Sequence, residues 1–511
     1  MSPAEQKAPK KPALERFLDA VEWAGNRLPE PATLFVLLCA AVVLLSAAVA
    51  STGWSVRHPS TGVEVGAVSL ANGDGLRRML TSAVSNFTGF APLGMVLVTL
   101  LGVGVAEGSG LLAAGLRAVA LAAPRRVVTA AVVFTGIVSN VASDAGYVVF
   151  IPLAALVFRA FGRHPLAGIA AAFAGVSGGF SANLLVGSTD VLLAAITEPA
   201  AHIVDEAYRV TPLANYYFLF ASTFLLVAVG TWVTDRIVEP RLGRYEGGAE
   251  EAMVPLEPKE RRGLALAAAA TALLLILLAW SVVPEGAVLR DPRTGGFLTS
   301  PFLTGIVPII VVLFWVPAIV YGVTVGTVRS DSDVTRMMAK ALSGMGSYLV
   351  LVFFAAQFIA FFSWTHLGLI TAIEGALGLQ TVGLTGWPLL VVFVLVSGAV
   401  NLVIASASAK WALMAPVFVP MFMLLGYTPE LTQAAFRVAD SSTNLVTPML
   451  SYFPLIIALA QRYRKDAGIG TMIALMLPYS IAFLVTWTFF LLAWVGLDLP
   501  LGPGAGVRLA P

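Results

Sequence analysis

"FRVADSSTNLVTPML", residues 436–450, is a strongly polar stretch between two apolar segments of this chain. Arg437, Asp440, Asn444 and Pro448 fall within it, together with several hydroxyl side chains, while Ala, Leu, Ile, Val and Phe dominate on both sides. Such a concentration of polar groups in apolar surroundings needs a physical reason. What it indicates depends first on the class of protein.

The composition indicates a membrane protein. The chain has 511 residues, of which 58% are hydrophobic and 12% charged, and its mean hydropathy is +0.86. Soluble domains carry about 25% charged residues. The net charge of +2 gives no reason to expect a nucleic-acid partner, and a lone cysteine, Cys39, excludes a disulfide framework and a cysteine metal cluster. The first thirty residues are too polar for a secretory signal.

Nine apolar segments are long enough to cross a lipid bilayer as helices. A helix needs roughly 20 apolar residues to span the hydrocarbon. By this criterion we expect crossings at 31–50, 84–106, 165–195, 213–234, 263–283, 301–323, 344–362, 433–461 and 470–494. The predicted fold class is therefore an all-α polytopic membrane protein.

Two more apolar stretches, 127–158 and 388–425, differ from simple crossings. Each has two short apolar arms around a small polar tip, SNVASDAG at 139–146 and NLVIASASAK at 401–410. Irregular backbone at membrane depth is tolerated only where protein buries it or water reaches it. We therefore expect two re-entrant helical hairpins in addition to the nine crossings.

Basic residues fix the expected orientation. With the N-terminus inside and each hairpin returning to its own side, most Lys and Arg fall in cytoplasmic segments, as the positive-inside rule requires. Lys410 and Arg437 are left within the membrane. We expect the N-terminus inside and the C-terminus outside.

The two hairpins then enter from opposite sides, which favours an inverted-topology repeat. ASDAGYVVFIP (142–152) aligns with SASAKWALMAP (406–416), and SANLLVG (181–187) aligns with STNLVTP (442–448). Inverted repeats with paired interrupted helices are typical of secondary transporters, which bind their substrates near the bilayer midplane.

The predicted organisation has five parts. They are a cytoplasmic tail (1–30), a first repeat (31–235, with hairpin 127–158 and broken helix 165–195), a linker (236–300, with an extra helix at 263–283), a second repeat (301–495, with hairpin 388–425 and broken helix 433–461) and an outer tail (496–511). The extra helix reverses the orientation of the second repeat.

The two broken helices carry the first candidate site residues. Arg437 and Asp440 are three residues apart and share a helix face, so they either pair structurally or form a substrate or ion site. Pro448 and the hydroxyls before it predict an unwound helix centre. In the partner break, Asp190 either contributes to the site or caps a helix.

The hairpin tips carry the others. Asp144 either caps the following helix or binds a ligand, and Lys410 either snorkels to the surface or balances an acidic group. Trp411 either belongs to the interfacial aromatic belt or is a platform for an aromatic ring. Asn140 and Asn401 are amides, whose oxygens suit Na⁺ and whose N–H groups suit a carboxylate substrate.

These ligands are hard oxygens, which suit Na⁺ better than a transition metal, and the Asp residues leave proton coupling open. The expected cation-binding or coupling residues are Asn140, Asp144, Asn183, Asn401, Asp440, Ser442 and Asn444. No His falls within a predicted crossing, and Walker A, HExxH and paired-Cys motifs do not occur in the sequence. We expect no cofactor beyond Na⁺ or H⁺ as the coupling ion.

At this level of detail the chain resembles the aminobenzoyl-glutamate transporter (AbgT) family. The resemblance covers about residues 20–495 and is carried by NRLPEPATLF, SNVASDAGYVVFIPL, GGFSANLLVGSTDVLLA, SASAKWALMAPVFVPMFMLLGYTPELTQAAFRVADSSTNLVTPM and YFPLIIALAQRYRKDAGIGTMIALMLPYSI. It implies a homodimer in the bacterial inner membrane, with nine helices and two hairpins per subunit. The architecture is similar to that of divalent-anion/sodium symporters and implies elevator-like motion.

The resemblance also implies substrates and site residues. Members of the family carry p-aminobenzoyl-glutamate, and some export sulfonamide antimetabolites, which confers antibiotic resistance. With Lys410 added for its charge, the substrate-binding residues expected here are Asp190, Ser408, Lys410, Trp411, Pro429, Arg437 and Pro448. The family motif places Asp440 among the transport residues and Na⁺ ligands near the Asn residues named above.

Three functions compete at this point. The first is a cation-coupled symporter or antiporter of aminobenzoyl-glutamate or antifolate-like compounds. The second is a Na⁺-coupled carrier of simple dicarboxylates, in which Trp411 is incidental. The third is an intramembrane enzyme that uses Asp144, Asp190 or Asp440 as acid and base, but Asp440 has a basic neighbour where an aspartyl dyad needs a second carboxylate. We favour a carrier, and expect no enzyme activity.

Overall fold

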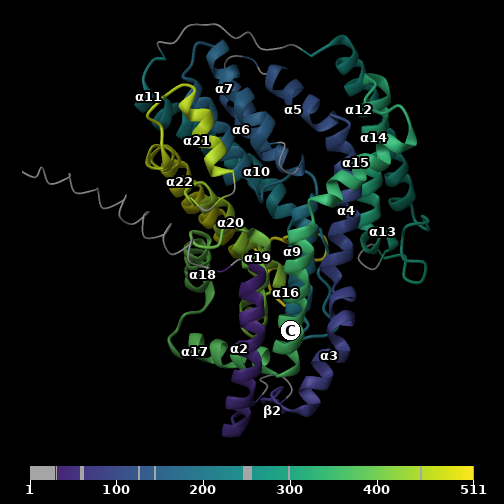
Figure 1. Ribbon diagram of the computed structural model, residues 1–511, viewed down its shortest axis with the longest axis vertical. Helices are drawn as coiled ribbons and strands as arrows, with labels where there is room; N and C mark the ends of the chain where they lie inside the picture. Colours follow the sequence, from purple (N-terminus) through teal and green to yellow (C-terminus); the bar gives the residue numbers. More distant parts are fainter. Residues whose placement is uncertain are drawn as a thin grey trace, which may run out of the picture.

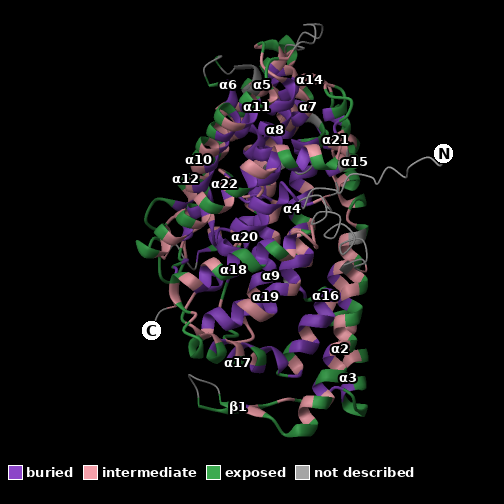
Figure 2. Cartoon of the chain, turned by 90° about the vertical axis from the view of Figure 1, so that its left-hand side faces the viewer, coloured by how far each residue is buried: buried purple, intermediate pink, exposed green. Residues whose placement is uncertain are grey.

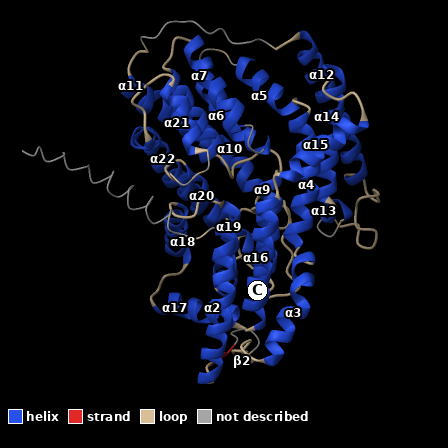
Figure 3. Cartoon of the chain, viewed as in Figure 1, coloured by secondary structure: helices blue, strands red, loops and turns tan. Residues whose placement is uncertain are grey.

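The computed structural model describes residues 29, 31–57, 62–122, 124, 127–142, 146–245, 256–296, 300–448, 450 and 452–509. Over these residues the chain is built from helices, apart from isolated bridges and one small antiparallel sheet of β1 (Ser55–Arg57) and β2 (Glu64–Gly66) (Figures 1 and 3). The predicted all-α class is confirmed.

Within the described residues, seven spans are long and apolar enough to cross a membrane. They are formed by α2 (Pro31–Thr52), α3 (Gly73–Thr88) with α4 (Ala91–Gly108), α10 (Tyr216–Val233) with η4 (Thr234–Val238) and α11 (Glu239–Leu242), α12 (Pro258–Val282), α14 (Ile306–Val325), α19 (Ala407–Leu424) and α22 (Ile469–Gly496). The short α13 (Pro301–Thr304) precedes α14. A count of nine crossings stays a prediction.

Four helices lie outside the predicted crossings or extend beyond them. α15 (Asp331–Ser343) precedes α16 (Gly346–Trp364) at an angle of 52°, and α5 (Leu111–Ala122) and α17 (Leu367–Thr381) lie in stretches where no crossing was expected. Most of α3 also precedes the crossing expected at 84–106. α3 and α15 are amphipathic, so an apolar-run criterion does not detect them.

Both predicted hairpins have two helical arms, although residues 143–145 of the first tip lie outside the described residues. In the first, α6 (Val128–Val138) and η1 (Ser139–Ala142) lead to η2 (Gly146–Phe150) and α7 (Ile151–Ala160). In the second, residues 402–406 join α18 (Gly386–Asn401) to α19. The positions agree with the stretches 127–158 and 388–425, while re-entry into the membrane stays a prediction.

Both predicted broken helices are interrupted. α8 (Pro165–Phe173) and η3 (Ala174–Gly178) are separated from α9 (Ser188–Ala201), and α20 (Pro429–Asn444) is separated from α21 (Phe453–Gln461). The unwound centre expected at the hydroxyl run closed by Pro448 begins later than predicted, because α20 stays helical through Asn444.

The hydroxyl side chains in and just after α20 bond to carbonyls of the helix rather than to a ligand. Thr443 Oγ1 donates to the carbonyl of Ala439 at 2.7 Å, and Thr447 Oγ1 donates to the carbonyl of Thr443 at 2.8 Å. This back-bonding satisfies the hydroxyls on the helix itself. Pro448 lies in the irregular segment that separates α20 from α21, as expected for the interruption.

α20 is the most polar of the central helices and is nevertheless buried along its whole length. It contacts α18, α19, α22 and α9, so helices of both predicted repeats surround it. Figure 2 shows buried residues concentrated around α8, α9 and α20. The polar groups of α20 must therefore find their partners within the protein.

The C-terminal residues 500–509, which we call the C-terminal strap, pack against two helix starts. Tyr217 N, in the first turn of α10, donates to Leu501 O at 2.9 Å. Thr428 N, at the start of α20, donates to Val507 O at 3.3 Å. The strap thus joins one helix from each predicted repeat.

Candidate functional site

The site is built on α20, whose start is fixed by local sequence. Thr428 is the N-cap, and its side chain accepts a hydrogen bond from Leu431 N at 3.3 Å. Pro429 follows at the first helical position, where its missing N–H costs nothing. From there the helix carries Arg437 and Asp440 into the middle of the protein.

Arg437 forms a buried ion pair with Asp190. Its Nη2 lies 2.6 Å from Asp190 Oδ1, and the two side chains are 1% and 5% exposed. Asp190 stands in the first turn of α9, where Oδ2 accepts a hydrogen bond from Gly187 N at 2.7 Å. Asp190 therefore both caps α9 and pairs with Arg437, while its part in a substrate or ion site stays a prediction. The pair links the two broken helices.

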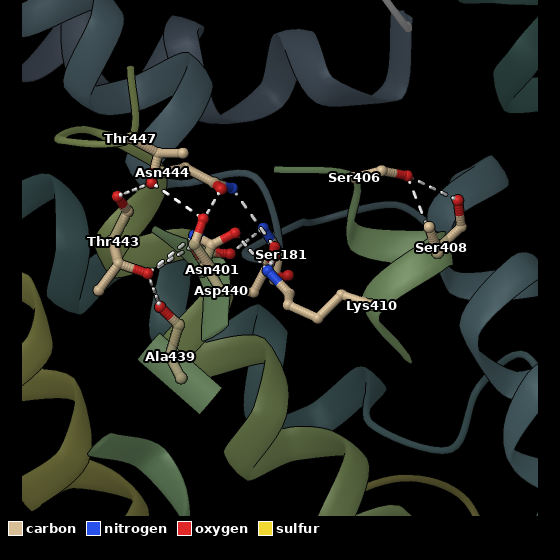
Figure 4. Close-up of polar contacts among 12 residues, drawn as sticks. Ser181, Asn401, Ser406, Ser408, Lys410, Ala439, Asp440, Thr443, Asn444 and Thr447 are labelled. Carbon is tan, nitrogen blue, oxygen red and sulfur yellow. Dashed lines mark hydrogen bonds and ion pairs between the residues drawn. The ribbon is translucent and has the colours of Figure 1, made fainter. Parts of the chain in front are cut away.

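Asp440 pairs with Lys410, not with Arg437. The Lys410 ammonium lies 2.5 Å from Asp440 Oδ1 and also donates to Asn401 Oδ1 (Figure 4). The Lys410 and Asp440 side chains are 0% and 1% exposed, so Lys410 balances an acid and does not snorkel. The helical spacing that favoured an Arg437–Asp440 pair is overridden by partners from α9 and α19.

Asn401, the last residue of α18, is the hub of this second cluster. Its amide nitrogen lies 2.9 Å from Asp440 O and 2.8 Å from both Thr443 Oγ1 and Asn444 Oδ1. Asn444 in turn donates to Asp440 Oδ2 at 3.3 Å, and Thr447 Oγ1 donates to Asn401 O at 3.4 Å. Hairpin tip and broken helix are thereby held together (Figure 4).

The irregular segment between η3 and α9 contacts α20, and fewer of its polar groups are hydrogen-bonded than in the cluster around Asn401. Ser181 N donates to Ser441 Oγ at 3.0 Å, and Ser181 O accepts from Arg437 Nη2 at 3.4 Å. Within the described part of the chain, four buried side-chain oxygens here have no hydrogen-bond partner: those of Ser177, Ser181, Asn183 and Ser442. Unpartnered buried oxygens are costly, and each needs an explanation such as local strain, an ordered water or a bound ion.

Trp411 lies inside the protein and not in an interfacial belt. Its side chain is fully buried, its indole N–H donates to Thr197 Oγ1 at 2.9 Å, and its ring lies 4.5 Å from the Phe436 ring, tilted by 31°. Gln433 Nε2 donates to the same Thr197 oxygen at 2.6 Å. In this conformation the indole is part of the packing between α19, α9 and α20.

The remaining predicted residues lie further from the ion pairs. Asn140 is buried, and its amide donates to Ile137 O at 3.0 Å. Ser408 is half-buried on the second tip, beside Ser406 and apart from Lys410 (Figure 4). Pro429 and Pro448 stand near opposite ends of α20. Asp144 lies outside the described residues.

Sequence reasoning missed a polar group at the start of α20. Glu430 is 4% exposed, and its carboxylate accepts a hydrogen bond from Tyr208 Oη at 2.8 Å. Asn215 Nδ2 donates to the carbonyl of Glu430 at 2.8 Å. An acidic residue directly after the N-cap and proline reads as ordinary helix capping, so nothing in the sequence signals that it is buried.

Comparison with known proteins now decides the family. The sequence profile of the AbgT putative transporter family matches residues 16–509. The chain belongs to the AbgT family. It is 40% identical to the p-aminobenzoyl-glutamate transport protein of Escherichia coli (strain K12) over 490 residues, which cover 96% of each chain.

Two solved AbgT structures have the same fold. The YdaH transporter of Alcanivorax borkumensis is 46% identical with a TM-score of 0.89, covering 93% of this chain and all of YdaH. MtrF of Neisseria gonorrhoeae, described as illuminating a class of antimetabolite efflux pumps, is 50% identical with a TM-score of 0.90, covering 96% of this chain and all of MtrF. This AbgT member is therefore an integral membrane transporter, and the alternative of an intramembrane enzyme is excluded.

Proposed function

We propose that the chain is a cation-coupled secondary transporter of p-aminobenzoyl-glutamate-type compounds, of sulfonamide antimetabolites, or of both. The observation that carries this proposal is that α20 holds two buried ion pairs, Arg437–Asp190 with α9 and Lys410–Asp440 with α19. Charges sealed inside an apolar protein are costly, and in membrane proteins they mark substrate or ion pathways.

The chemistry of these groups suits the proposed substrates. A guanidinium binds a carboxylate through two parallel hydrogen bonds, and Arg437 Nε has no partner among the described residues. The glutamate part of p-aminobenzoyl-glutamate supplies two carboxylates. The names of the Escherichia coli and Neisseria gonorrhoeae relatives support the same two compound classes.

Burial of the site supports alternating access. The four charged side chains of the two pairs are at most 5% exposed, so neither aqueous side reaches them in this conformation. Substrate entry then requires the hairpin tips to move relative to the rest of the protein. We propose an elevator-like movement in a homodimer of the bacterial inner membrane, with the N-terminus inside and the C-terminus outside.

A coupling cation, Na⁺ or H⁺, completes the proposal. The oxygens of Asn401, Asp440 and Asn444 at one break and of Ser181 and Asn183 at the other are of the type that Na⁺ binds. Asp440 and Asp190 are the carboxylates through which protons would couple. The pseudo-symmetry of the two breaks, proposed from the sequence, gives the carrier two similar end states.

One observation keeps a dicarboxylate carrier as the second candidate. The face of Trp411 is covered by Phe436, and its N–H is taken by Thr197, so the indole offers no free platform for an aromatic ring in this conformation. A dicarboxylate needs only the cationic groups. Competition by succinate against labelled p-aminobenzoyl-glutamate separates the two candidates, because only a dicarboxylate carrier prefers succinate.

The direct test is flux in proteoliposomes. Uptake and efflux of labelled p-aminobenzoyl-glutamate and of a sulfonamide are measured with Na⁺ and pH gradients imposed separately. We expect gradient-driven flux of at least one compound. Absence of flux of both compounds under either gradient would refute the proposal.

Two substitutions test the site itself. We expect Asp440→Ala and Asp190→Asn to abolish flux while the purified proteins keep the elution volume of the wild type. Asp466→Asn, at an exposed ion pair with Arg464, is the matched control and should leave flux unchanged. Full flux in both site variants would show that the ion pairs are structural only.

A further inference from the structure

A cavity of about 360 Å³ lies between the end of the span formed by α10, η4 and α11 and the start of α22. Its walls come from α8, η4, α11, α21, α22 and the loop 462–468, and α11 and α21 lie at the same end of the molecule in Figure 1. Its charged lining residues are Arg241 and Arg464. Its apolar lining residues include Leu166, Leu242, Met472 and Leu475.

The wall of this cavity carries positive charge without a carboxylate of its own. Among the described residues, neither Asp nor Glu lines it. Asp235 and Glu239, which precede Arg241 in the chain, both form ion pairs with Arg163. Arg241 itself is exposed and has no ion pair or hydrogen bond within the described part of the chain. Its guanidinium is therefore available to an anion.

The second arginine is only partly engaged. Nε and Nη2 of Arg464 donate to the Asp466 carboxylate at 3.0 and 3.2 Å, which leaves Nη1 for a ligand. The two side chains are 48% and 72% exposed, so solvent screens their attraction. A phosphate in the cavity can consequently share Arg464 with Asp466.

Aromatic contacts fix the two segments that carry these arginines. The Tyr245 ring, four residues after Arg241, meets the ring of Tyr463 edge to face at a centroid distance of 6.2 Å. Tyr245 also contacts the His164 ring at 5.4 Å, and His164 is the N-cap of α8. The arginine-bearing segments are thus packed against each other and against α8, which keeps both guanidinium groups at one cavity.

The cavity lies where membrane-crossing helices end. The apolar span Tyr216–Leu242 finishes beside it, and α22, also apolar enough to cross a membrane, begins beside it. Gly470 and Ala474 of α22 line the cavity and are exposed, so it opens along the first turns of that helix. The basic residues around it lie on the side that the positive-inside rule predicts to be cytoplasmic.

A ligand that suits such a cavity has an anionic head and an apolar tail. A guanidinium binds phosphate oxygens through charge-assisted hydrogen bonds, and apolar walls favour hydrocarbon over water. Basic pockets between membrane helices on the cytoplasmic side bind anionic lipid headgroups. The cavity is too small for a whole phospholipid, so the acyl chains would extend along α22 into the bilayer.

We propose that this cavity binds an anionic phospholipid of the cytoplasmic leaflet, with its phosphate held by Arg241 and Arg464. The acyl chains lie against Leu242 and Leu475. The site is separate from the ion pairs of α20 and goes beyond the proposed transport function. A lipid bound there joins the end of α11 to the start of α22 and stabilises the folded protein.

The test is thermal unfolding of the purified full-length protein in a neutral detergent, with dioleoyl phosphatidylglycerol added stepwise and no substrate present. A ligand that binds only the folded state raises the melting temperature with its concentration. Dioleoyl phosphatidylcholine, which has the same chains and no net charge, and inorganic phosphate are added in separate titrations. We expect a saturable rise with phosphatidylglycerol and with neither of the other two.

Three arginine variants locate the response. Arg241→Gln and Arg464→Gln should each raise the half-saturating phosphatidylglycerol concentration about fivefold, the equivalent of about 1 kcal/mol per cationic side chain at a membrane surface. Arg462→Gln is the matched control, because Arg462 is exposed in the same loop and is not among the residues that line the cavity. Its half-saturating concentration should equal that of the wild type.

Three results would overturn the proposal. Equal rises with phosphatidylglycerol and phosphatidylcholine would show that the headgroup charge is not recognised, and the wild type alone decides this. A rise of the same size with inorganic phosphate would show an anion site that needs no lipid. A loss of affinity in Arg462→Gln as large as in Arg241→Gln would show general surface attraction. None of these titrations depends on substrate flux, so their failure is distinct from failure of the proposed function.

Discussion

The Arg437–Asp190 pair provides a quantitative test of how the two predicted repeats are held together. Asp190→Asn removes one charge and leaves the Arg437 guanidinium buried at 1% exposure. The amide oxygen of Asn can still accept the hydrogen bond from Gly187 N that Asp190 Oδ2 accepts at 2.7 Å. The substitution therefore isolates the loss of the ion pair from the loss of the cap on α9.

The expected effect is large because the pair is buried. Removing one member of a buried ion pair leaves an uncompensated charge and costs about 3–5 kcal/mol. A second substitution, Arg437→Gln, removes that charge as well. The double variant should therefore be less destabilised than the sum of the two single variants, by about 1–3 kcal/mol.

The assay is denaturant-induced unfolding of the purified protein in detergent, followed by tryptophan fluorescence, for the wild type, both single variants and the double variant. Asp466→Asn is the control, because its pair with Arg464 is exposed (48% and 72%) and solvent screens it, so no measurable change is expected. If the two single effects add within about 0.5 kcal/mol, the pair does not couple the breaks and the reasoning is wrong.

Three further predictions concern packing and pH. Trp411→Phe removes the indole hydrogen bond and should cost about 1 kcal/mol of unfolding free energy, against about 3–5 kcal/mol for Trp411→Ala, in the same assay. Gly146→Ala should lower the melting temperature, because the new methyl lies 2.3 Å from Ser139 Oγ, whereas Gly115→Ala, which meets no atom within 4 Å, should not; equal melting temperatures would contradict this. Burial lowers the pKa of His164 below its ordinary 6.5, and its Nδ1 accepts a backbone hydrogen bond at 3.2 Å, which requires the neutral ring. The contribution of His164 to the unfolding free energy is therefore fully present above about pH 6.5 and is lost as the pH falls below it. The melting temperature of the wild type should fall more steeply over this range than that of His164→Asn.

Much of the fold follows from hydropathy because the bilayer imposes one length on every crossing helix. The segments expected at 31–50, 213–234 and 263–283 coincide with α2, α10 and α12. Amphipathic helices such as α15 carry charges on one face, so a search for apolar runs passes over them. Their place is set by tertiary packing, which a single sequence does not display.

It was easier to predict from the sequence which residues belong to the site than which of them pair with one another. A charged residue in an apolar run is conspicuous, so Asp190, Lys410, Arg437 and Asp440 were all identified from the sequence. The pairing of these residues was not predicted, because Arg437 lies 247 residues from Asp190. The i, i+3 and i, i+4 spacing of a helix relates only neighbours three or four positions apart. The extent of α20 was also underestimated, since the hydroxyls that suggested unwinding are bonded to helix carbonyls instead.

The C-terminal strap makes the start of α10 and the start of α20 parts of one mechanical unit. Its backbone is hydrogen-bonded to Tyr217 on one side and to Thr428 on the other, and Leu509 N is bonded to Gly426 O at 3.0 Å. Two helices that are distant in the chain must then travel together whenever either moves. Truncation of the C-terminal strap should consequently disturb the starts of both α10 and α20. A purification tag at this end needs a spacer so that it does not disturb the packing of the strap against the two helices.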